Sequence, residues 1–257
     1  MIVNKDYTID LMKKGVREDG RALDEYRQPI KVEYGISGKA AEGSAQVTMG
    51  DTIVIAGVKL ETAVPYPDTP DEGTLMVNTE LTALSSPEYE PGPPPIDSIE
   101  LARVVDRGIR ESHSLNFEKL CIKSGEKMWI VCVDIYTINA AGNLFDACAL
   151  AALAALKDAK FPAFDGVKID YKNRTDKSLP LESLPIACTV WRVADKWIVD
   201  PTRAEELASD ARLTVAFDDD DNVCAMQKGG NAPMSEEEIE HVVNTASDKA
   251  KILREVL

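Results

Sequence analysis

Residues 128–157 read MWIVCVDIYTINAAGNLFDACALAALAALK, and this stretch decides the fold. Its first part, 128–139, is rich in the branched and aromatic residues that favour a β-strand. Gly142 and Asn143 then break the chain, and 144–157 is apolar on nearly every side. A helix without a polar face is buried among other elements. The stretch therefore predicts a strand, a turn and a deeply buried helix.

Strand signals dominate the chain before this stretch. Residues that favour strands occupy 30–64, interrupted by a Gly50–Asp51 turn, and a further strand is expected at 74–84. Ser98 is a candidate N-cap for a helix from 99 to about 112, whose apolar residues recur every three or four positions. The first part of the chain therefore places strands before a helix.

The second part of the chain repeats this order. The expected elements are a strand at 167–171, hairpins at 186–199 and 212–227, and a helix at 235–257 with Ser235 and Glu238 at capping-box spacing. The order of strands followed by helices thus occurs twice. It predicts an α+β fold of two similar strand-rich halves with packed helices. We expect a lead-in at 1–28 and a domain at 29–257, with the halves meeting near residue 125.

Composition limits the classes of function. The 257 residues are 44% hydrophobic, which is enough for a sizeable core. A net charge of −15 argues against nucleic-acid binding by the whole surface, so any RNA contact requires a local basic patch. No apolar run is long enough to cross a bilayer, and the first residues lack a secretory signal. We therefore expect a cytoplasmic protein without membrane contact.

The residue types that bind metals are sparse or poorly arranged. The five cysteines include no C-x-x-C pair, which favours reduced, buried thiols, and two histidines exclude a His-rich zinc site. The four aspartates at 218–221 favour a solvated turn, because a calcium loop alternates its acids with other residues and contains a glycine. We expect no metal site in this chain.

Several short motifs, in order over nearly the whole chain, resemble the ribonuclease PH-like family. They are Arg17-x-Asp19-Gly20-Arg21, then Gly43-Ser44-Ala45 with Gly50-Asp51-Thr52, and finally Gln227-Lys228-Gly229 before the last helix. Three further segments resemble one branch of that family, the non-catalytic ring subunit of the archaeal RNA exosome. They are 100–107, 142–147 and 199–202.

The resemblance implies a fold and an assembly. The fold is that of ribonuclease PH, and the assembly is a six-membered ring, a trimer of heterodimers with a catalytic sister subunit. RNA-binding cap proteins lie on one face of such a ring, and single-stranded RNA is degraded from 3′ to 5′. Mg²⁺ and inorganic phosphate are then expected at the partner's active site, and no cofactor is expected in this chain.

The turn before the buried helix argues against catalysis by this chain. In active members of the family, a Gly-Ser/Thr-Arg turn at a helix N-terminus forms a cradle for phosphate. Here the hydroxyl and the arginine are replaced by Asn143 and Leu144, and Asp146 in the first helical turn would repel a phosphate. We therefore predict no catalytic residue.

An active enzyme is the alternative. The family's two acidic residues, six positions apart, match Asp200 and Glu206, and both side chains can ligate Mg²⁺. A phosphorolytic 3′-to-5′ exoribonuclease would use this pair. The simpler interpretation is that Asp200 hydrogen-bonds its turn while Glu205 and Glu206 lie on a solvated surface. An unrelated small-molecule enzyme would need a nucleophile or base constellation that the sequence does not present.

One basic patch stands out on the helix expected at 99–112. Arg103, Arg107 and Arg110 fall within about 60° of one another on a helix and could meet successive phosphates. Equally, Glu100 could pair with Arg103 and Asp106 with Arg110, and spacing alone favours that ion-paired surface. The resemblance implies instead that this helix faces the RNA path beside the sister's active site. We therefore predict that the three arginines bind RNA.

Overall fold

The computed structural model describes residues 5–257, which form three sheets. The largest has the spatial order β1 (Ile30–Tyr34), β2 (Gly43–Met49), β3 (Thr52–Ala63), β6 (Lys127–Asn139) and β4 (Thr74–Glu80), and β5 (Cys121–Lys123) also pairs with β6. The second has the order β10 (Lys196–Val199), β9 (Ile186–Val193), β11 (Ala211–Phe217) and β12 (Val223–Gly230). The third pairs β7 (Lys160–Phe164) with β8 (Ile169–Ser178).

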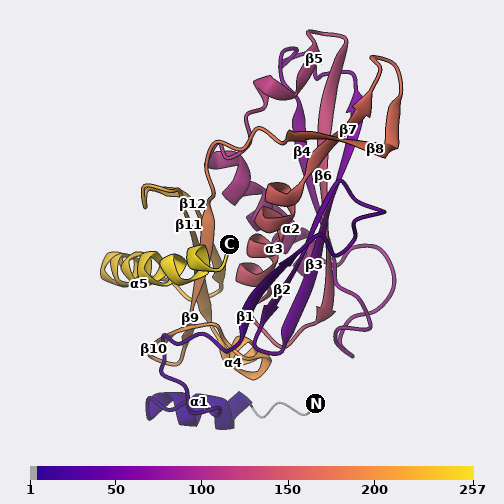
Figure 1. Ribbon diagram of the computed structural model, residues 1–257. Helices are drawn as coiled ribbons and strands as arrows, with labels where there is room; N and C mark the ends of the chain where they lie inside the picture. Colours follow the sequence, from indigo (N-terminus) through magenta and orange to yellow (C-terminus); the bar gives the residue numbers. More distant parts are fainter. Residues whose placement is uncertain (1–4) are drawn as a thin grey trace.

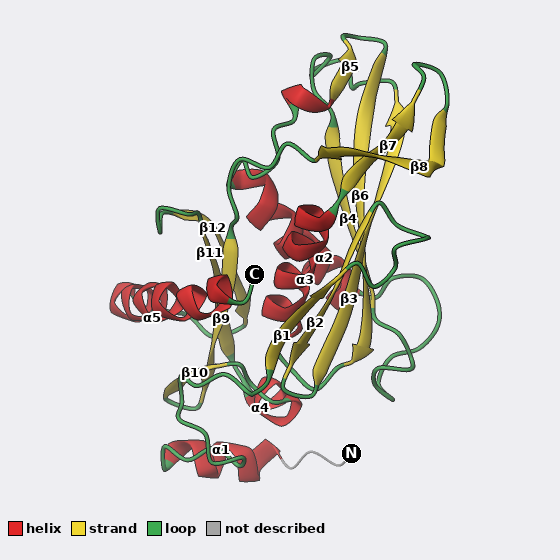
Figure 2. Cartoon of the chain, viewed as in Figure 1, coloured by secondary structure: helices red, strands yellow, loops and turns green. Residues whose placement is uncertain are grey.

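Helices fill the space between and beside the sheets. They are α1 (Lys5–Lys13), α2 (Ile96–Glu111), α3 (Leu144–Asp158), α4 (Arg203–Ala208) and α5 (Glu236–Glu255), with a 3₁₀ turn at Glu118–Leu120. Figure 1 shows α2 and α3 between the largest sheet and the second sheet, with α5 on the outer side of the second sheet. The same layering is clear in Figure 2. The predicted α+β architecture is confirmed.

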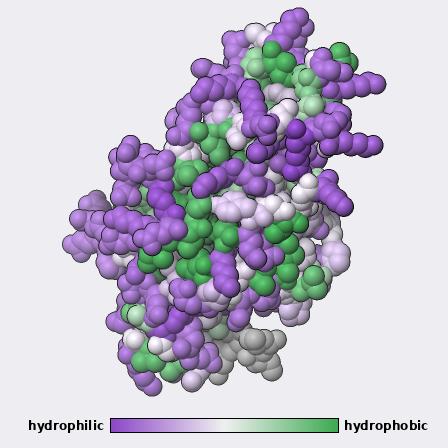
Figure 3. Space-filling view, in the orientation of Figure 1, coloured by the Kyte–Doolittle hydropathy of each residue, from purple (hydrophilic) through white to green (hydrophobic). Residues whose placement is uncertain are grey.

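The buried helix expected from the sequence is α3. Most of its alanine and leucine side chains are fully buried, because the helix packs on β2 and β3 on one side and on β9 on the other. Gly43 of β2 lies so close to the end of α3 that a Cβ atom would overlap the backbone of Ala155 and Ala159. The helix therefore packs between the two large sheets, together with α2. Figure 3 shows that hydrophilic residues cover much of the outer surface in the same view.

The edge of the largest sheet positions the candidate site. β4 pairs with β6 in parallel register and is the last strand of its sheet, and α2 packs against it. α2 begins at Ile96, before the expected start, and the predicted N-cap Ser98 does not cap it. The Ser98 hydroxyl donates instead to the backbone carbonyl of Thr79 on β4. Ser98 thus fastens the helix to the sheet edge.

Other boundaries differ from the sequence prediction because tertiary pairing decides them. The lead-in contains α1, and residues 1–4 of it lie outside the described residues. β6 follows residue 125 but is an inner strand of the largest sheet, so the expected division near 125 is not the division between sheets.

Both residues of the expected Ser235–Glu238 capping box make their reciprocal bonds. Within residues 5–257, no helix has both the length and the apolar composition needed to cross a bilayer.

Candidate nucleic-acid interface

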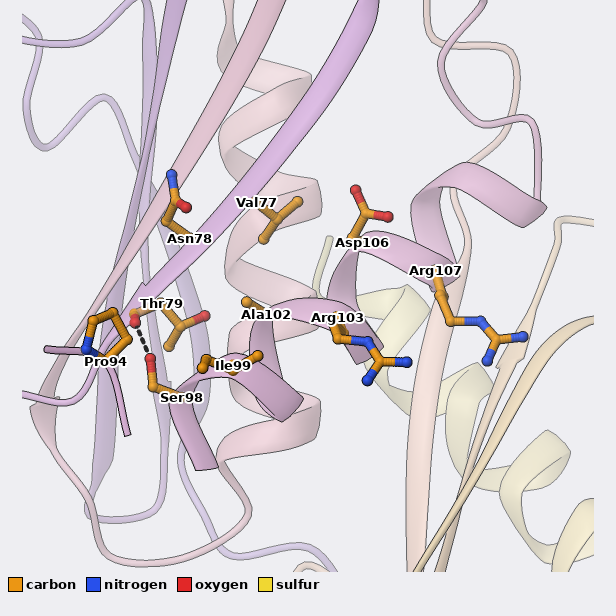
Figure 4. Close-up of a pocket in the computed structure, with 10 residues that line it drawn as sticks. All are labelled: Val77, Asn78, Thr79, Pro94, Ser98, Ile99, Ala102, Arg103, Asp106 and Arg107. Atoms are coloured by element: carbon orange, nitrogen blue, oxygen red, sulfur yellow. Dashed lines mark hydrogen bonds between the residues drawn. The ribbon is translucent and has the colours of Figure 1, made fainter. Parts of the chain in front are cut away.

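Arg103 and Arg107, two of the three arginines predicted to bind RNA, are exposed on α2. Figure 4 shows both guanidinium groups extending away from the helix in the same general direction. Arg107 makes one long hydrogen bond, from Nη1 to Oε1 of Gln227 at 3.4 Å. Among residues 5–257, no carboxylate forms an ion pair with either arginine. These two guanidinium groups are therefore available to phosphates.

Arg110, the third predicted arginine, is held in a different way. Its Nε and Nη2 donate to the two carboxylate oxygens of Asp106 at 2.9 and 2.8 Å, and Nη2 also donates to the Leu75 carbonyl at 2.9 Å. The hydrogen bonds to Asp106 are the main reason that the pKa of Arg110 is raised. The expected Asp106–Arg110 pair is therefore present, and it ties α2 to the edge of β4.

The expected Glu100–Arg103 pair does not form, because Glu100 has another partner. Oε1 of Glu100 lies 2.6 Å from Nη2 of Arg212 on β11. The Arg212 guanidinium stacks on the rings of Phe145 and Trp191, with its Cζ atom 4.3 and 5.4 Å from their centroids. Because Glu100 pairs with Arg212, Arg103 lacks the counter-ion that the sequence suggested.

At the turn before α3, a backbone N–H group donates a hydrogen bond to the carboxylate of Glu206. Asn143 has a left-handed conformation with φ of 54°, and its backbone N–H donates to Oε1 of Glu206 at 2.8 Å. Oε2 of Glu206 accepts from Nη1 of Arg203 at 3.0 Å. Burial raises the pKa of Glu206, and the charge of Arg203 opposes that shift. The expectation that Glu206 lies on a solvated surface is wrong, because the fold turns α4 back onto this donor.

Asp146 lies beneath the turn instead of facing the site. Its side chain is fully buried, and Oδ2 accepts from Nδ2 of Asn143 at 3.0 Å. Burial raises the pKa of Asp146 to about 7. This carboxylate is therefore partly neutral near neutral pH and repels a distant phosphate less than the sequence alone predicts.

Asp200 is enclosed by the arginines of the N-terminal segment. Its Oδ1 accepts from Nη2 of Arg27 at 2.8 Å, and its Oδ2 accepts from the backbone N–H and Nε of Arg27 at 2.6 and 2.9 Å. Nη1 of Arg21 lies 3.1 Å from Oδ2. Asp200 therefore bonds the N-terminal segment, and the expectation that its side chain bonds its own turn is wrong. A divalent cation does not fit here, because both oxygens are occupied and two guanidinium groups would repel it.

Glu205, also expected on a solvated surface, is buried against Arg17. Nε and Nη2 of Arg17 donate to the two Glu205 oxygens at 2.9 and 2.7 Å, and Arg17 is only 2% exposed. Nη1 and Nη2 also donate to the carbonyls of Val199 and Asp200 at 2.9 and 2.8 Å. We call these residues the arginine clamp: Arg17, Arg21 and Arg27 with Asp200 and Glu205. The R-x-D-G-R motif thus contributes two arginines that fasten the N-terminal segment to the loop before α4.

The sequence prediction missed the clamp and the Arg212–Glu100 pair. One signal could have indicated the clamp. The lead-in contains three arginines, at 17, 21 and 27, and the second half contains three acids close together, at 200, 205 and 206. Over the described chain, 5–257, no three His, Cys, Asp or Glu side chains are arranged to hold a metal ion. The turn at 218–221 is closed by its own hydrogen bonds, as Asp218 accepts from the N–H groups of Asp220 and Asn222.

The sequence matches a family over most of its length. The 3′ exoribonuclease family, of the RNase PH type, matches with its domain 1 over residues 26–162 and with its domain 2 over residues 183–249. The chain therefore belongs to the 3′ exoribonuclease family.

Its relatives include named subunits of an archaeal complex. The exosome complex component Rrp42 of Archaeoglobus fulgidus is 46% identical over 253 residues, which cover 98% of this chain and 95% of the relative. The protein of the same name from Methanocella arvoryzae is 43% identical over 255 residues, covering 99% and 95%. The resemblance predicted from the short motifs is confirmed.

Solved structures agree with this family assignment. A chain of the Archaeoglobus fulgidus exosome with RNA bound to the active site superposes with a TM-score of 0.90 and 46% identity, covering 98% of this chain and 96% of that chain. A chain of an archaeal exosome core superposes with a TM-score of 0.86 and 43% identity, covering 98% and 94%. The fold is therefore that of ribonuclease PH, as predicted.

Proposed function

We propose that this chain is a non-catalytic subunit of an archaeal-type exosome ring that degrades RNA from 3′ to 5′. It binds RNA through Arg103 and Arg107 and shapes the active site of a catalytic sister subunit. Arg110, which the sequence groups with them, holds α2 in place through Asp106 and the Leu75 carbonyl. The relatives named as exosome components, which match over nearly their full length, support this proposal.

The single observation that carries the non-catalytic assignment is the Glu206 carboxylate at the N-terminus of α3. Phosphorolysis needs an attacking phosphate held by N–H donors or positive charge. At the corresponding turn the N–H of Asn143 already donates to Glu206, and Leu144 stands where active members have an arginine. A phosphate there would meet a negative charge that is held in place by Arg203.

The arginine clamp argues against the alternative in which Asp200 and Glu206 hold Mg²⁺. Both oxygens of Asp200 accept hydrogen bonds from guanidinium groups, so releasing the fully buried carboxylate for a metal would leave the partly buried Arg21 and Arg27 without this partner. We therefore expect Mg²⁺ and inorganic phosphate at the partner's active site. The assembly we propose is a trimer of heterodimers in the cytoplasm, with RNA-binding cap proteins on one face.

A phosphorolysis assay tests the proposal. A labelled poly(A) RNA would be incubated with Mg²⁺ and phosphate in the presence of this chain, of its catalytic sister, or of the two co-purified. We expect release of nucleoside diphosphates mainly from the co-purified complex, and none when phosphate is omitted. Release by this chain alone would overturn the non-catalytic assignment and make Asp200 and Glu206 catalytic candidates. Failure of the two chains to co-purify would overturn the proposed partnership.

A further inference from the structure

A cavity of about 350 Å³ lies between α2 and the edge of β4, directly beside Arg103 and Arg107. Figure 4 shows that the strand contributes Val77, Asn78 and Thr79 and that the helix contributes Ile99 and Ala102. This volume lies at the small end of the range of about 300–1,000 Å³ for ligand pockets. The cavity therefore suits one compact group.

Two backbone acceptors on the edge of β4 are already used. The carbonyls of Leu75 and Thr79 accept hydrogen bonds from Arg110 and Ser98 of α2, so two edge acceptors four residues apart are already used. Strand addition needs a run of unpaired backbone groups along the edge. The cavity at Val77, between these two anchors, therefore favours a compact occupant over an added strand of a partner protein.

The rim of the cavity carries uncompensated positive charge. Arg103 and Arg107 lie at the rim without a carboxylate partner among residues 5–257. Asp106 also lines the cavity, but both of its oxygens accept from Arg110. The rim is therefore cationic in a chain whose net charge is −15.

We propose that this cavity is a nucleoside subsite. It takes one ribonucleoside of an RNA strand whose neighbouring phosphates bind Arg103 and Arg107. Ile99, half exposed at 51%, and Val77 offer apolar surface to the base, while Asn78 offers polar atoms. The inference rests on the proposed RNA-binding function and adds a contact that phosphate binding alone does not require.

Filling the cavity tests the inference. Ala102→Leu places a larger apolar side chain in the cavity at a helical position that leucine suits. Binding of labelled oligo(A) to the full chain would be measured by fluorescence anisotropy over about 50–200 mM salt. We expect affinity to fall by about tenfold, because the base contact is lost. The slope of affinity against salt should stay the same, because no phosphate contact changes.

Two variants keep the test independent of folding. Ile99→Ala should lower affinity about threefold through lost apolar contact, again with an unchanged salt slope. Ile96→Ala removes a side chain that is 80% exposed on the same helix and does not line the cavity, so it should leave affinity unchanged. Thermal unfolding of each variant would verify that α2 stays in place.

Abasic RNA separates base contact from phosphate contact. In the unmodified chain, moving one abasic ribose along the oligonucleotide should identify a position where affinity drops about tenfold. The same position should have no effect in Ala102→Leu. Unchanged RNA affinity in folded Ala102→Leu, with lower affinity in Arg107→Ala, would overturn the subsite and leave the proposed function standing. Unchanged affinity in both would overturn the RNA-binding part of the proposed function. Loss of partner binding without loss of RNA affinity would assign the cavity to a protein.

Discussion

Two groups of arginines in this chain have opposite surroundings. In the arginine clamp, Arg17 is buried and bonded to both oxygens of Glu205, and Asp200 receives hydrogen bonds from two further guanidinium groups. On α2, Arg103 and Arg107 are exposed and have no carboxylate partner among the described residues. An arginine side chain is structural where it is buried and paired with a carboxylate. It is available for a ligand where it is exposed and has no carboxylate partner.

Arg17→Met should have the largest effect on stability, and it tests whether the arginine clamp holds the fold together. Removal of the guanidinium leaves the Glu205 carboxylate buried and unpaired, which costs about 3–5 kcal/mol of unfolding free energy. Urea denaturation followed by circular dichroism measures this loss.

Matched variants make the clamp test specific. Lys13→Ala removes an exposed cation that lies 3.6 Å from Asp10, and its effect should stay within about 0.5 kcal/mol. Adding Glu205→Leu to Arg17→Met should recover part of the loss, because the unpaired charge is gone. A loss below about 1 kcal/mol in Arg17→Met would show that the clamp does not stabilise the fold.

Asp146 sharpens the comparison, because it is a buried carboxylate without an arginine. Its pKa is raised from 3.8 to about 7, mainly by burial. In the native state the group keeps its proton at pH values where the unfolded chain has released it. Its contribution to stability is therefore complete below about pH 4 and is lost as the pH rises through about 7.

Asp146→Asn removes this titration while keeping the shape of the side chain. We expect the variant to gain stability relative to the unmodified chain as the pH is raised from about 5 to 8, by up to a few kcal/mol. Urea denaturation at both pH values measures the difference. Parallel pH profiles for the two proteins would contradict the raised pKa of Asp146.

Arg103→Ala and Arg107→Ala test the other side of the comparison. Each should weaken RNA binding about tenfold and reduce the salt slope by about one, because one phosphate contact is lost. The unfolding free energy should change little, since neither side chain has a buried partner. Anisotropy titrations at several salt concentrations measure both quantities. An unchanged slope in both variants would remove α2 from the RNA path.

Arg110→Ala should have the smallest effect and is the matched control for those two variants. Loss of its bonds to Asp106 and the Leu75 carbonyl should cost about 1 kcal/mol, because the pair is partly exposed. The salt slope should not change, since Arg110 is proposed to hold the helix instead of a phosphate. A lower slope in Arg110→Ala would support the prediction from the sequence that all three arginines bind RNA.

Much of the fold was predictable from local pattern. The strand at 127–139 and the helix at 144–158 match the expected stretch closely, because side-chain periodicity directly reflects which faces are buried. The start of α2 was not predictable in the same way. Ser98 has the chemistry of an N-cap, but its hydroxyl bonds the Thr79 carbonyl, which a neighbouring strand supplies only in the folded chain.

The candidate site was predictable only in part. The stripe of arginines on α2 follows from helical spacing, and the loss of the phosphate cradle follows from Asn143 and Leu144. The position of Glu206 at the Asn143 N–H does not follow from spacing, since the two residues are 63 positions apart. For the same reason, the sequence predicted solvated acids where the structure has buried ones.

The sequence by itself determined the class of fold, the family and the residues that could carry function. Those properties depend on periodicity and on short motifs, which are local. Only the tertiary structure decided which arginines are occupied and which are free, because a guanidinium group's partners come from anywhere in the chain. Arg17 meets Glu205 across 188 positions, and Arg110 meets the Leu75 carbonyl across 35. Charge pairing inside a protein is a property of three-dimensional distance, and sequence spacing predicts it only within a single helix.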